Sequence, residues 1–140
     1  MNSSASNFYL LPEHWALMEA DVRLKAPEEA CGIIAGERNQ AHLVIPVTNI
    51  LHSPHQFRMD PEEELKAFYQ VEERGLEMIA VYHSHPHGID RPSPTDHAEL
   101  TFYGTIYLIW YEYNGQWQCR GYKMNSQDDN EEITLVIRHP

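Results

Sequence analysis

A short apolar run, Met78–Tyr82, constrains the fold of this chain more than any other feature. Gly75 bounds it on one side and Pro86 on the other, and its length and composition are typical of a buried central strand. Such a strand belongs inside a sheet, with helices packed against that sheet. The sequence therefore favours an α/β domain over an all-helical one.

The rest of the chain supplies the other elements of such a domain. Pro12, Asp60 and Ser93 stand where helices typically begin, and Gly75 stands where the second helix ends. In chain order we predict a helix over 12–25, strands over 30–36 and 43–47, a helix over 61–74, a strand over 78–82, a helix over 94–103 and strands over 105–113, 116–124 and 132–137. We expect a single domain over residues 1–140 with a mixed sheet, and flexible segments at 1–7 and 125–130.

Composition narrows the class of protein and of partner. Acidic residues outnumber basic ones by 21 to 10, and the net charge of −11 opposes binding to nucleic acid. The apolar runs are too short to span a membrane. Only two cysteines occur, and no secretory signal precedes the first helix, so we expect a cytoplasmic protein. The sequence carries no signal for the oligomeric state.

Two histidines follow the central strand directly. His83 and His85 alternate with Ser84 in a segment that is still extended, so their side chains leave the same face about 6.6 Å apart at the backbone. Two imidazoles placed in this way can bind one ion. Isolated histidines more often lie on the surface or in a hydrogen-bonded core, and the remaining histidines are interpreted in that way.

A carboxylate returns to the same place from Ser93-Pro94-Thr95-Asp96. This pattern predicts a helix N-terminus with a capping box, which alone would explain all of these residues. A carboxylate at a helix N-terminus also stays ionised, as a metal ligand must. His83, His85 and Asp96 are therefore candidate ligands of a metal ion with one open position, the arrangement of a catalytic zinc site.

Such a site needs a general base that is not itself a ligand. Glu28 and Glu29 both stand at the start of the strand predicted over 30–36. Each could serve as the base or be a solvated acid at a strand end. The residue pattern alone leaves both possibilities open.

Three segments together resemble the JAMM, or MPN-plus, metalloprotease family. They are Glu29-Ala-Cys-Gly-Ile-Ile-Ala-Gly36, His83-Ser-His-Pro and, separated from His85 by seven intervening residues, Ser93-Pro-Thr-Asp96. The resemblance implies an α/β fold with a curved mixed β-sheet sandwiched by helices, of the cytidine-deaminase-like type. It also implies that His83, His85 and Asp96 bind Zn²⁺. In this family Glu29, rather than Glu28, would move a proton from the zinc water to the leaving amine, and Ser93 would steady the oxyanion.

The resemblance also implies a substrate class. Family members cleave peptide or isopeptide bonds at the C-terminus of ubiquitin-like proteins. Phe102-Tyr103-Gly104 runs straight into the next predicted strand, without the insertion that grips ubiquitin in eukaryotic members. Compact bacterial-type members resemble hydrolases that release cysteine or another amino acid from a sulfur-carrier protein. The alternative is a non-catalytic MPN-type scaffold, or protein-interaction domain, with a structural metal.

Other enzyme classes are less compatible with the sequence. A cysteine hydrolase would need an activated Cys31 or Cys119, and both lie in apolar strand patterns where thiols are usually inert. The helical His-Glu-x-x-His pattern of other zinc proteases is missing. His87 and His97 are interpreted as loop and helix surface, with an extra polar role at the site as the alternative.

Overall fold

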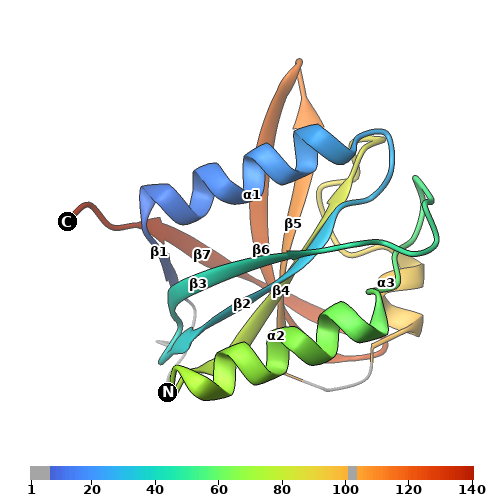
Figure 1. The fold of residues 1–140 in the computed structure, drawn as a ribbon. Helices are drawn as coiled ribbons and strands as arrows, with labels where there is room; N and C mark the ends of the chain where they lie inside the picture. The colour runs from blue at the N-terminus through green and yellow to red at the C-terminus, as the bar shows by residue number, and fades with distance from the viewer. Residues whose placement is uncertain (1–6, 101–103) are drawn as a thin grey trace.

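The computed structural model describes residues 7–100 and 104–140 (Figure 1). Its elements, in chain order, are β1 Asn7–Leu10, α1 Pro12–Lys25, β2 Cys31–Glu37, β3 Gln40–Val47, α2 Pro61–Glu73, β4 Glu77–His85, α3 Pro94–Ala98, β5 Thr105–Tyr113, β6 Gln116–Ser126 and β7 Asp129–Ile137. The predicted helices and strands are all present, and β1 is an additional strand. The segment predicted as flexible at 1–7 lies outside the described residues except for Asn7, which begins β1. Residues 125–130 contain the end of β6, the start of β7 and the turn between them, and their flexibility stays a prediction.

The strands form one closed sheet in the order β1-β3-β2-β4-β5-β6-β7, in which β1 also pairs with β7. β4 pairs in parallel with β5, and β1 in parallel with β7, whereas the β2–β3, β2–β4, β5–β6 and β6–β7 pairs are antiparallel. The mixed sheet was therefore predicted correctly. The closure was not, because a curved sheet sandwiched by helices was expected, and the additional strand β1 joins the two sides.

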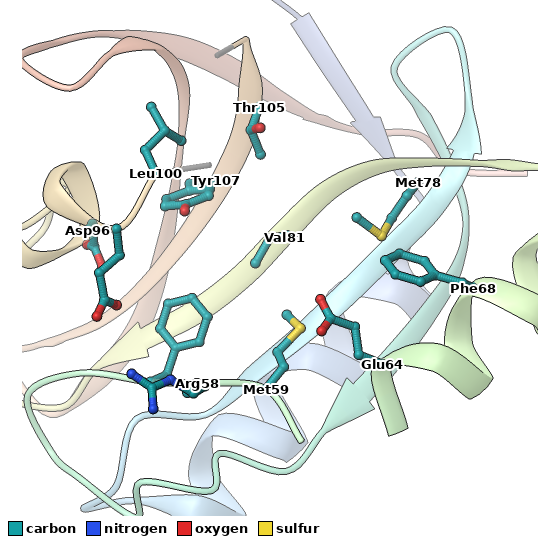
Figure 2. Close-up of a pocket in the computed structure, with 12 residues that line it drawn as sticks. Arg58, Met59, Glu64, Phe68, Met78, Val81, Asp96, Leu100, Thr105 and Tyr107 are labelled. Carbon is teal, nitrogen blue, oxygen red and sulfur yellow. The ribbon is translucent and has the colours of Figure 1, made fainter. Parts of the chain in front are cut away.

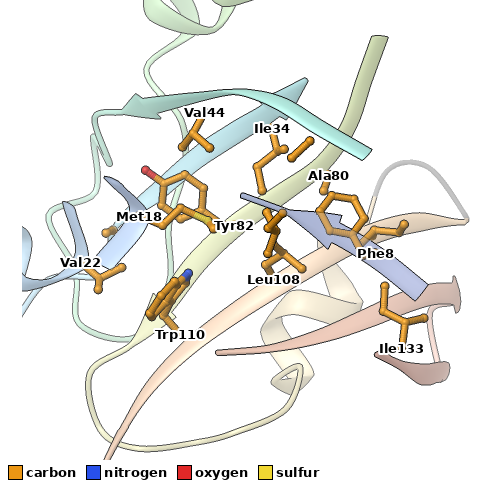
Figure 3. Close-up of a cluster of buried hydrophobic side chains, with 14 residues drawn as sticks. Phe8, Met18, Val22, Ile34, Val44, Ala80, Tyr82, Leu108, Trp110 and Ile133 are labelled. Atoms are coloured by element: carbon orange, nitrogen blue, oxygen red, sulfur yellow. The ribbon is translucent and has the colours of Figure 1, made fainter. Parts of the chain in front are cut away.

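Side chains alternate between the two faces of the sheet, as strand geometry requires. Figure 3 shows the larger core, in which Tyr82, Leu108 and Trp110 meet Met18 and Val22 of α1. On the opposite face Ile33 and Val47 pack with Ala67 of α2. In Figure 1, α1 and α2 accordingly lie on opposite sides of β2 and β4. Helices thus flank both faces of these strands, as predicted, although the sheet as a whole is closed.

Helix α1 has the predicted bounds, and its buried face includes two polar residues. The apolar residues Leu17 and Leu24 are exposed, whereas His14 and Asp21 are buried with Met18.

Within the described residues, no helix is both long and apolar enough to cross a membrane.

Helix α3 begins at Pro94 as predicted but ends at Ala98, earlier than the predicted residue 103. Residues 101–103 lie outside the described part of the chain.

Candidate metal centre and active site

Strand β4 carries two histidines into the interior at its C-terminal end. It continues through His85, paired with β2 as far as His83 and with β5 as far as His85. His83 is fully buried and His85 is 4% exposed. Their Nε2 atoms lie 3.2 Å apart. The two imidazoles predicted to share one face therefore converge on one point.

The capping box at the start of α3 delivers a carboxylate to the same point. Ser93 Oγ accepts from the backbone N–H of Asp96 at 3.0 Å, and Asp96 Oδ2 accepts from the backbone N–H of Ser93 at 2.8 Å. That same Oδ2 lies 3.1 Å from Nε2 of His83 and 3.1 Å from Nε2 of His85. The capping and metal-site interpretations of this segment are thus compatible, because one oxygen takes part in both arrangements.

The hydrogen bond of His85 provides a test of whether these three residues fit a metal ion. Its Nδ1 lies 2.9 Å from the carbonyl oxygen of Ile89, which can only accept, so Nδ1 carries the hydrogen. A neutral ring then turns the lone pair of Nε2 toward the carboxylate of Asp96. These groups repel one another unless a cation lies between them. The separations of 3.1–3.2 Å are close to the edges of about 3.3 Å expected for a tetrahedral zinc site.

The protonation preferences of the metal-free site differ between the two histidines, because hydrogen bonding and charge from Asp96 raise the pKa of His85 despite its burial. Burial lowers the pKa of His83, which favours the neutral imidazole that metals require. Burial opposes ionisation of Asp96, but His83 and His85 outweigh it and hold the pKa of this carboxyl below its usual range. The site therefore offers two imidazoles and one ionised carboxylate.

Glu29, which directly precedes Ala30 and strand β2, faces the same two histidines. Its ligand atom and those of His83 and His85 all lie within 4.8 Å of one another, so these three form a group that could hold a metal ion. The Glu29 side chain is buried, and its Oε1 has no hydrogen-bond partner among the described residues. Burial raises the pKa of Glu29 to about 8, although His85 acts in the opposite direction. Glu28, in contrast, is exposed and pairs with His52 at 3.0 Å.

Asn49 was not singled out from the sequence, yet it holds Glu29 and the neighbouring loop together. Its Nδ2 donates to the carbonyl oxygens of Glu29 at 3.0 Å and Gln56 at 3.1 Å. Its Oδ1 accepts from the backbone N–H groups of Leu51 and Arg58, each at 3.1 Å. A buried asparagine whose amide nitrogen and oxygen both form hydrogen bonds to the backbone fixes the main chain beside the site. An asparagine directly after a predicted strand was the only sequence signal for it.

Ser84 was interpreted only as the spacer between the two histidines. Its side chain points to the opposite face of β4, where Oγ accepts from the backbone N–H of Ala30 at 2.8 Å. The backbone N–H of Ser84 donates to the Ala30 carbonyl at 3.0 Å. These two bonds join the residue after Glu29 to the residue between the histidines, and so fix the spacing between Glu29 and the two histidines.

A groove of about 540 Å³ opens beside Asp96 (Figure 2). Its lining is largely apolar, and it runs between the end marked by Asp96 and Tyr107 and the end marked by Phe68 and Met78. Phe57, which also lines it, stacks on His83 with ring centroids 4.6 Å apart. The groove therefore leads directly to the candidate metal centre.

The other side chains considered from the sequence lie away from the convergence point. His87 is exposed and stacks on His55, and His97 contacts Ser126 and Asn130 at the end of the β6–β7 hairpin. Burial raises the pKa of Cys31 to about 12 and also raises that of Cys119. Both thiols are thus held in the un-ionised form, which is a poor nucleophile.

Comparison with known proteins places these features in a family. Residues 12–120 match the family model described as prokaryotic homologs of the JAB domain. A desampylase of Pyrococcus furiosus is 29% identical over 97% of this chain and 98% of its own. A probable TtuB-protein conjugate cleaving protease of Thermus thermophilus is 43% identical over 54% of this chain and 51% of its own. A CysO-cysteine peptidase of Mycobacterium tuberculosis is 39% identical over 56% of each chain.

Solved structures share the fold. A protein of Desulfitobacterium hafniense, solved in solution, superposes with a TM-score of 0.85 at 28% identity and covers 95% of this chain and 94% of its own. A JAB1/MPN domain protein of Archaeoglobus fulgidus superposes with a TM-score of 0.55 at 20% identity over 94% of this chain and 98% of its own. The α/β fold is therefore that of JAB1/MPN domains.

Proposed function

Because this chain belongs to the family of prokaryotic homologs of the JAB domain, we propose that it is a zinc metallopeptidase that cleaves peptide or isopeptide bonds at the C-terminus of ubiquitin-like proteins. The observation that carries the proposal is the convergence of His83, His85 and Asp96 within 3.1–3.2 Å, with Glu29 facing the two histidines. The names of the relatives describe a desampylase, a conjugate-cleaving protease and a CysO-cysteine peptidase, which supports a protein conjugate as substrate. We favour release of cysteine or another amino acid from a sulfur-carrier protein. A cytoplasmic location stays a prediction from the sequence.

In this proposal His83, His85 and Asp96 hold the zinc ion. The bound ion would lower the pKa of a coordinated water to about 7 and polarise the scissile carbonyl. The Ile89 carbonyl keeps the His85 ring in the orientation that presents Nε2 to the site. Asp96 keeps its position because the helix N-terminus of α3 and the ligand set use the same oxygen.

Glu29 is proposed as the group that moves the proton. Its carboxyl is held close to the histidines, with one oxygen unpaired, so it can accept a proton from the attacking water and deliver it to the leaving amine. A pKa of about 8 keeps much of this carboxyl protonated at neutral pH. The positive charge of a metal ion bound by His83 and His85 would lower this pKa. Glu29 would therefore be ionised, and able to act as a base, when the site holds its metal ion.

Ser93 is proposed to stabilise the oxyanion. Its Oγ accepts from the backbone N–H of Asp96, which leaves the hydroxyl hydrogen to donate to a substrate oxygen as the carbonyl becomes tetrahedral. Loss of one such donor commonly lowers the rate about 100- to 1,000-fold.

The groove is proposed to hold the C-terminal tail of the substrate. β4 is already paired on one side with β2 and on the other with β5, so a tail cannot join β4 as another strand. Binding would depend on side-chain contacts with the apolar lining instead.

A comparison of three variants tests the function. We expect Glu29→Gln to retain bound zinc, measured by elemental analysis, and to lose about 100- to 10,000-fold in the rate of hydrolysis of a carrier-protein adduct, read by intact mass. His85→Ala should lose the zinc. Glu28→Gln, the matched control, should keep both zinc and activity, because Glu28 is exposed and pairs with His52.

Two outcomes would contradict the assignment. Wild-type rates in Glu29→Gln would remove Glu29 from the mechanism. A zinc-loaded wild-type protein that hydrolyses none of the adducts would support the alternative of a scaffold domain with a structural metal.

A further inference from the structure

The loop between β4 and α3, residues 86–93, supplies the bond that orients His85. The Ile89 carbonyl accepts from Nδ1 of His85 at 2.9 Å, so Nε2 stays turned toward the candidate metal centre. The side chain of Ile89 does little to hold this carbonyl in place, because it is 48% exposed. The position of the acceptor therefore depends on how the neighbouring residues of the loop are held.

The next residue, Asp90, is tied to strand β6 through both its backbone and its side chain. The hydroxyl of Tyr122 donates to the Asp90 carbonyl at 2.7 Å. Arg120, two residues earlier in β6, forms an ion pair with the Asp90 carboxylate, with Nη1 and Oδ2 3.0 Å apart. The Ile89 carbonyl belongs to the rigid peptide unit that joins Ile89 to Asp90. A shift of Asp90 would consequently move the acceptor of His85 as well.

Of these two bonds, the one from Tyr122 is anchored more firmly. The Tyr122 ring is only 5% exposed and packs in a buried cluster with Leu100 and Met124. The strand that carries it is paired with β5 on one side and β7 on the other. The side chains of Arg120 and Asp90, in contrast, are 42% and 27% exposed, and water weakens such an ion pair.

We propose that Tyr122 is a positioning residue for the metal site, because its hydroxyl fixes Asp90 and thereby the Ile89 carbonyl that orients His85. The inference rests on the proposed metal site but not on the choice of substrate. Without the hydroxyl, the Asp90 carbonyl loses this partner and the loop gains freedom. The His85 ring can then turn, or carry its hydrogen on Nε2, and either change keeps a metal ion from that nitrogen.

Tyr122→Phe is the test variant, because it removes only the hydroxyl and keeps the buried ring. Tyr111→Phe is the matched control, since Tyr111 lies on the neighbouring strand β5 and its hydroxyl donates to Gln118 at 3.2 Å. Arg120→Gln tests the ion pair with Asp90 separately. Zinc affinity is measured by competition with a chromogenic chelator. The absorption spectrum of the protein saturated with Co²⁺ reports the ligand geometry, and urea unfolding of the metal-free protein reports stability.

We expect Tyr122→Phe to weaken zinc binding about 10-fold, which is the lower end of the effect of losing a partner of a ligating histidine. Its Co²⁺ spectrum should also change at saturation, because His85 no longer keeps one orientation. Tyr111→Phe should match wild type in both measurements. Arg120→Gln should weaken zinc binding less than about 3-fold, since its ion pair is largely exposed.

A purely structural role of Tyr122 predicts a different result. The metal-free variant would then be less stable, but its Co²⁺ spectrum at saturation would be that of wild type. That outcome, a wild-type zinc affinity of Tyr122→Phe, or an equal loss of affinity in Tyr111→Phe would each overturn the inference. The proposed metal site itself fails if wild type binds no zinc or if His85→Ala binds it equally tightly, and Tyr122 would then have no ligand to position.

Discussion

Burial opposes the ionisation of both carboxyl groups of the site, but their pKa values are shifted in opposite directions. It raises the pKa of Glu29 to about 8, because this carboxyl loses contact with water and one of its oxygens is unpaired. Asp96 is also buried, but the hydrogen bonds and charges of His83 and His85 keep its pKa below the usual range. At neutral pH the metal-free site therefore combines an ionised Asp96 with a largely protonated Glu29.

The stability of the metal-free protein should consequently fall as pH rises. The ordinary pKa of Glu29 is 4.5, so between about pH 4.5 and 8 the folded protein binds a proton at Glu29 that the unfolded chain has released. The stabilisation contributed by Glu29 is fully present below about pH 4.5 and is lost as the pH rises to about 8. The free energy of unfolding then falls by up to about 1.4 kcal/mol per pH unit. Urea unfolding of chelator-treated protein across this range measures the slope.

Glu29→Gln provides the comparison, because it has no ionisable group at this position. The difference in unfolding free energy between wild type and variant isolates Glu29 from the histidines. If both proteins show the same slope, other groups cause the pH dependence and the burial argument for Glu29 is wrong.

At the scale of elements, the contact of β2 with β4 depends on a glycine. Gly32 pairs with Tyr82, and a Cβ at Gly32 would lie 2.1 Å from Cε2 of the tyrosine ring. The ring cannot move away freely, because its hydroxyl donates to Asp21 of α1 at 2.6 Å and Asp21 in turn pairs with Lys25 at 3.0 Å. Since His83 follows Tyr82 directly, this contact also fixes the strand that carries the metal ligands.

Gly32→Ala should therefore destabilise the protein by about 1–3 kcal/mol and weaken zinc binding. Thermal unfolding and zinc titration measure the two effects. Gly32→Ala combined with Tyr82→Leu should cost less than the sum of the single substitutions, because the smaller side chain makes room for the new methyl group. Strictly additive effects would show that the two residues do not compete for space.

The same elements show how much of the structure was predictable. The candidate ligands could be brought together from the sequence because His83, His85 and Asp96 lie close in sequence, where strand alternation and helix capping set their positions. The burial of Asp21 on α1 was not predicted, because this residue is buried through its bond with Tyr82, 61 residues away. Such a partner has no local sequence signal. Glu29 required the family resemblance, since Glu28 has the same chemistry and an adjacent position.

At the scale of the whole molecule, β1 closes the sheet. Residues 7–10 pair in parallel with residues 134–137, and Tyr9 pairs with Gln40 of β3 on the other side. Phe8 is fully buried and belongs to the same core as Tyr82 and Leu108. This strand was missed because it is short, follows a polar segment and pairs with distant residues.

Phe8→Ala should weaken the entire domain rather than its edge. Loss of this ring from the common core should lower the free energy of unfolding by about 3–5 kcal/mol in a single transition. Urea unfolding followed by tryptophan fluorescence and by zinc release should give coincident midpoints. Tyr113→Ala, at a position that is 60% exposed, is the control with little expected change. If Phe8→Ala released zinc at the same urea concentration as wild type, while only the midpoint of its fluorescence transition shifted, the sheet would be opening locally.

The parallel pairing of β1 with β7 also affects how the protein is made in the cell. Residues 7–10 are synthesised well before residues 134–137, the strand with which they pair. Contacts between such distant segments form late and slowly. The histidines of β4 are therefore translated well before the barrel around them can close. If the site binds zinc as proposed, the ion would be held firmly only once residues 134–137 have been made and β1 has paired with β7.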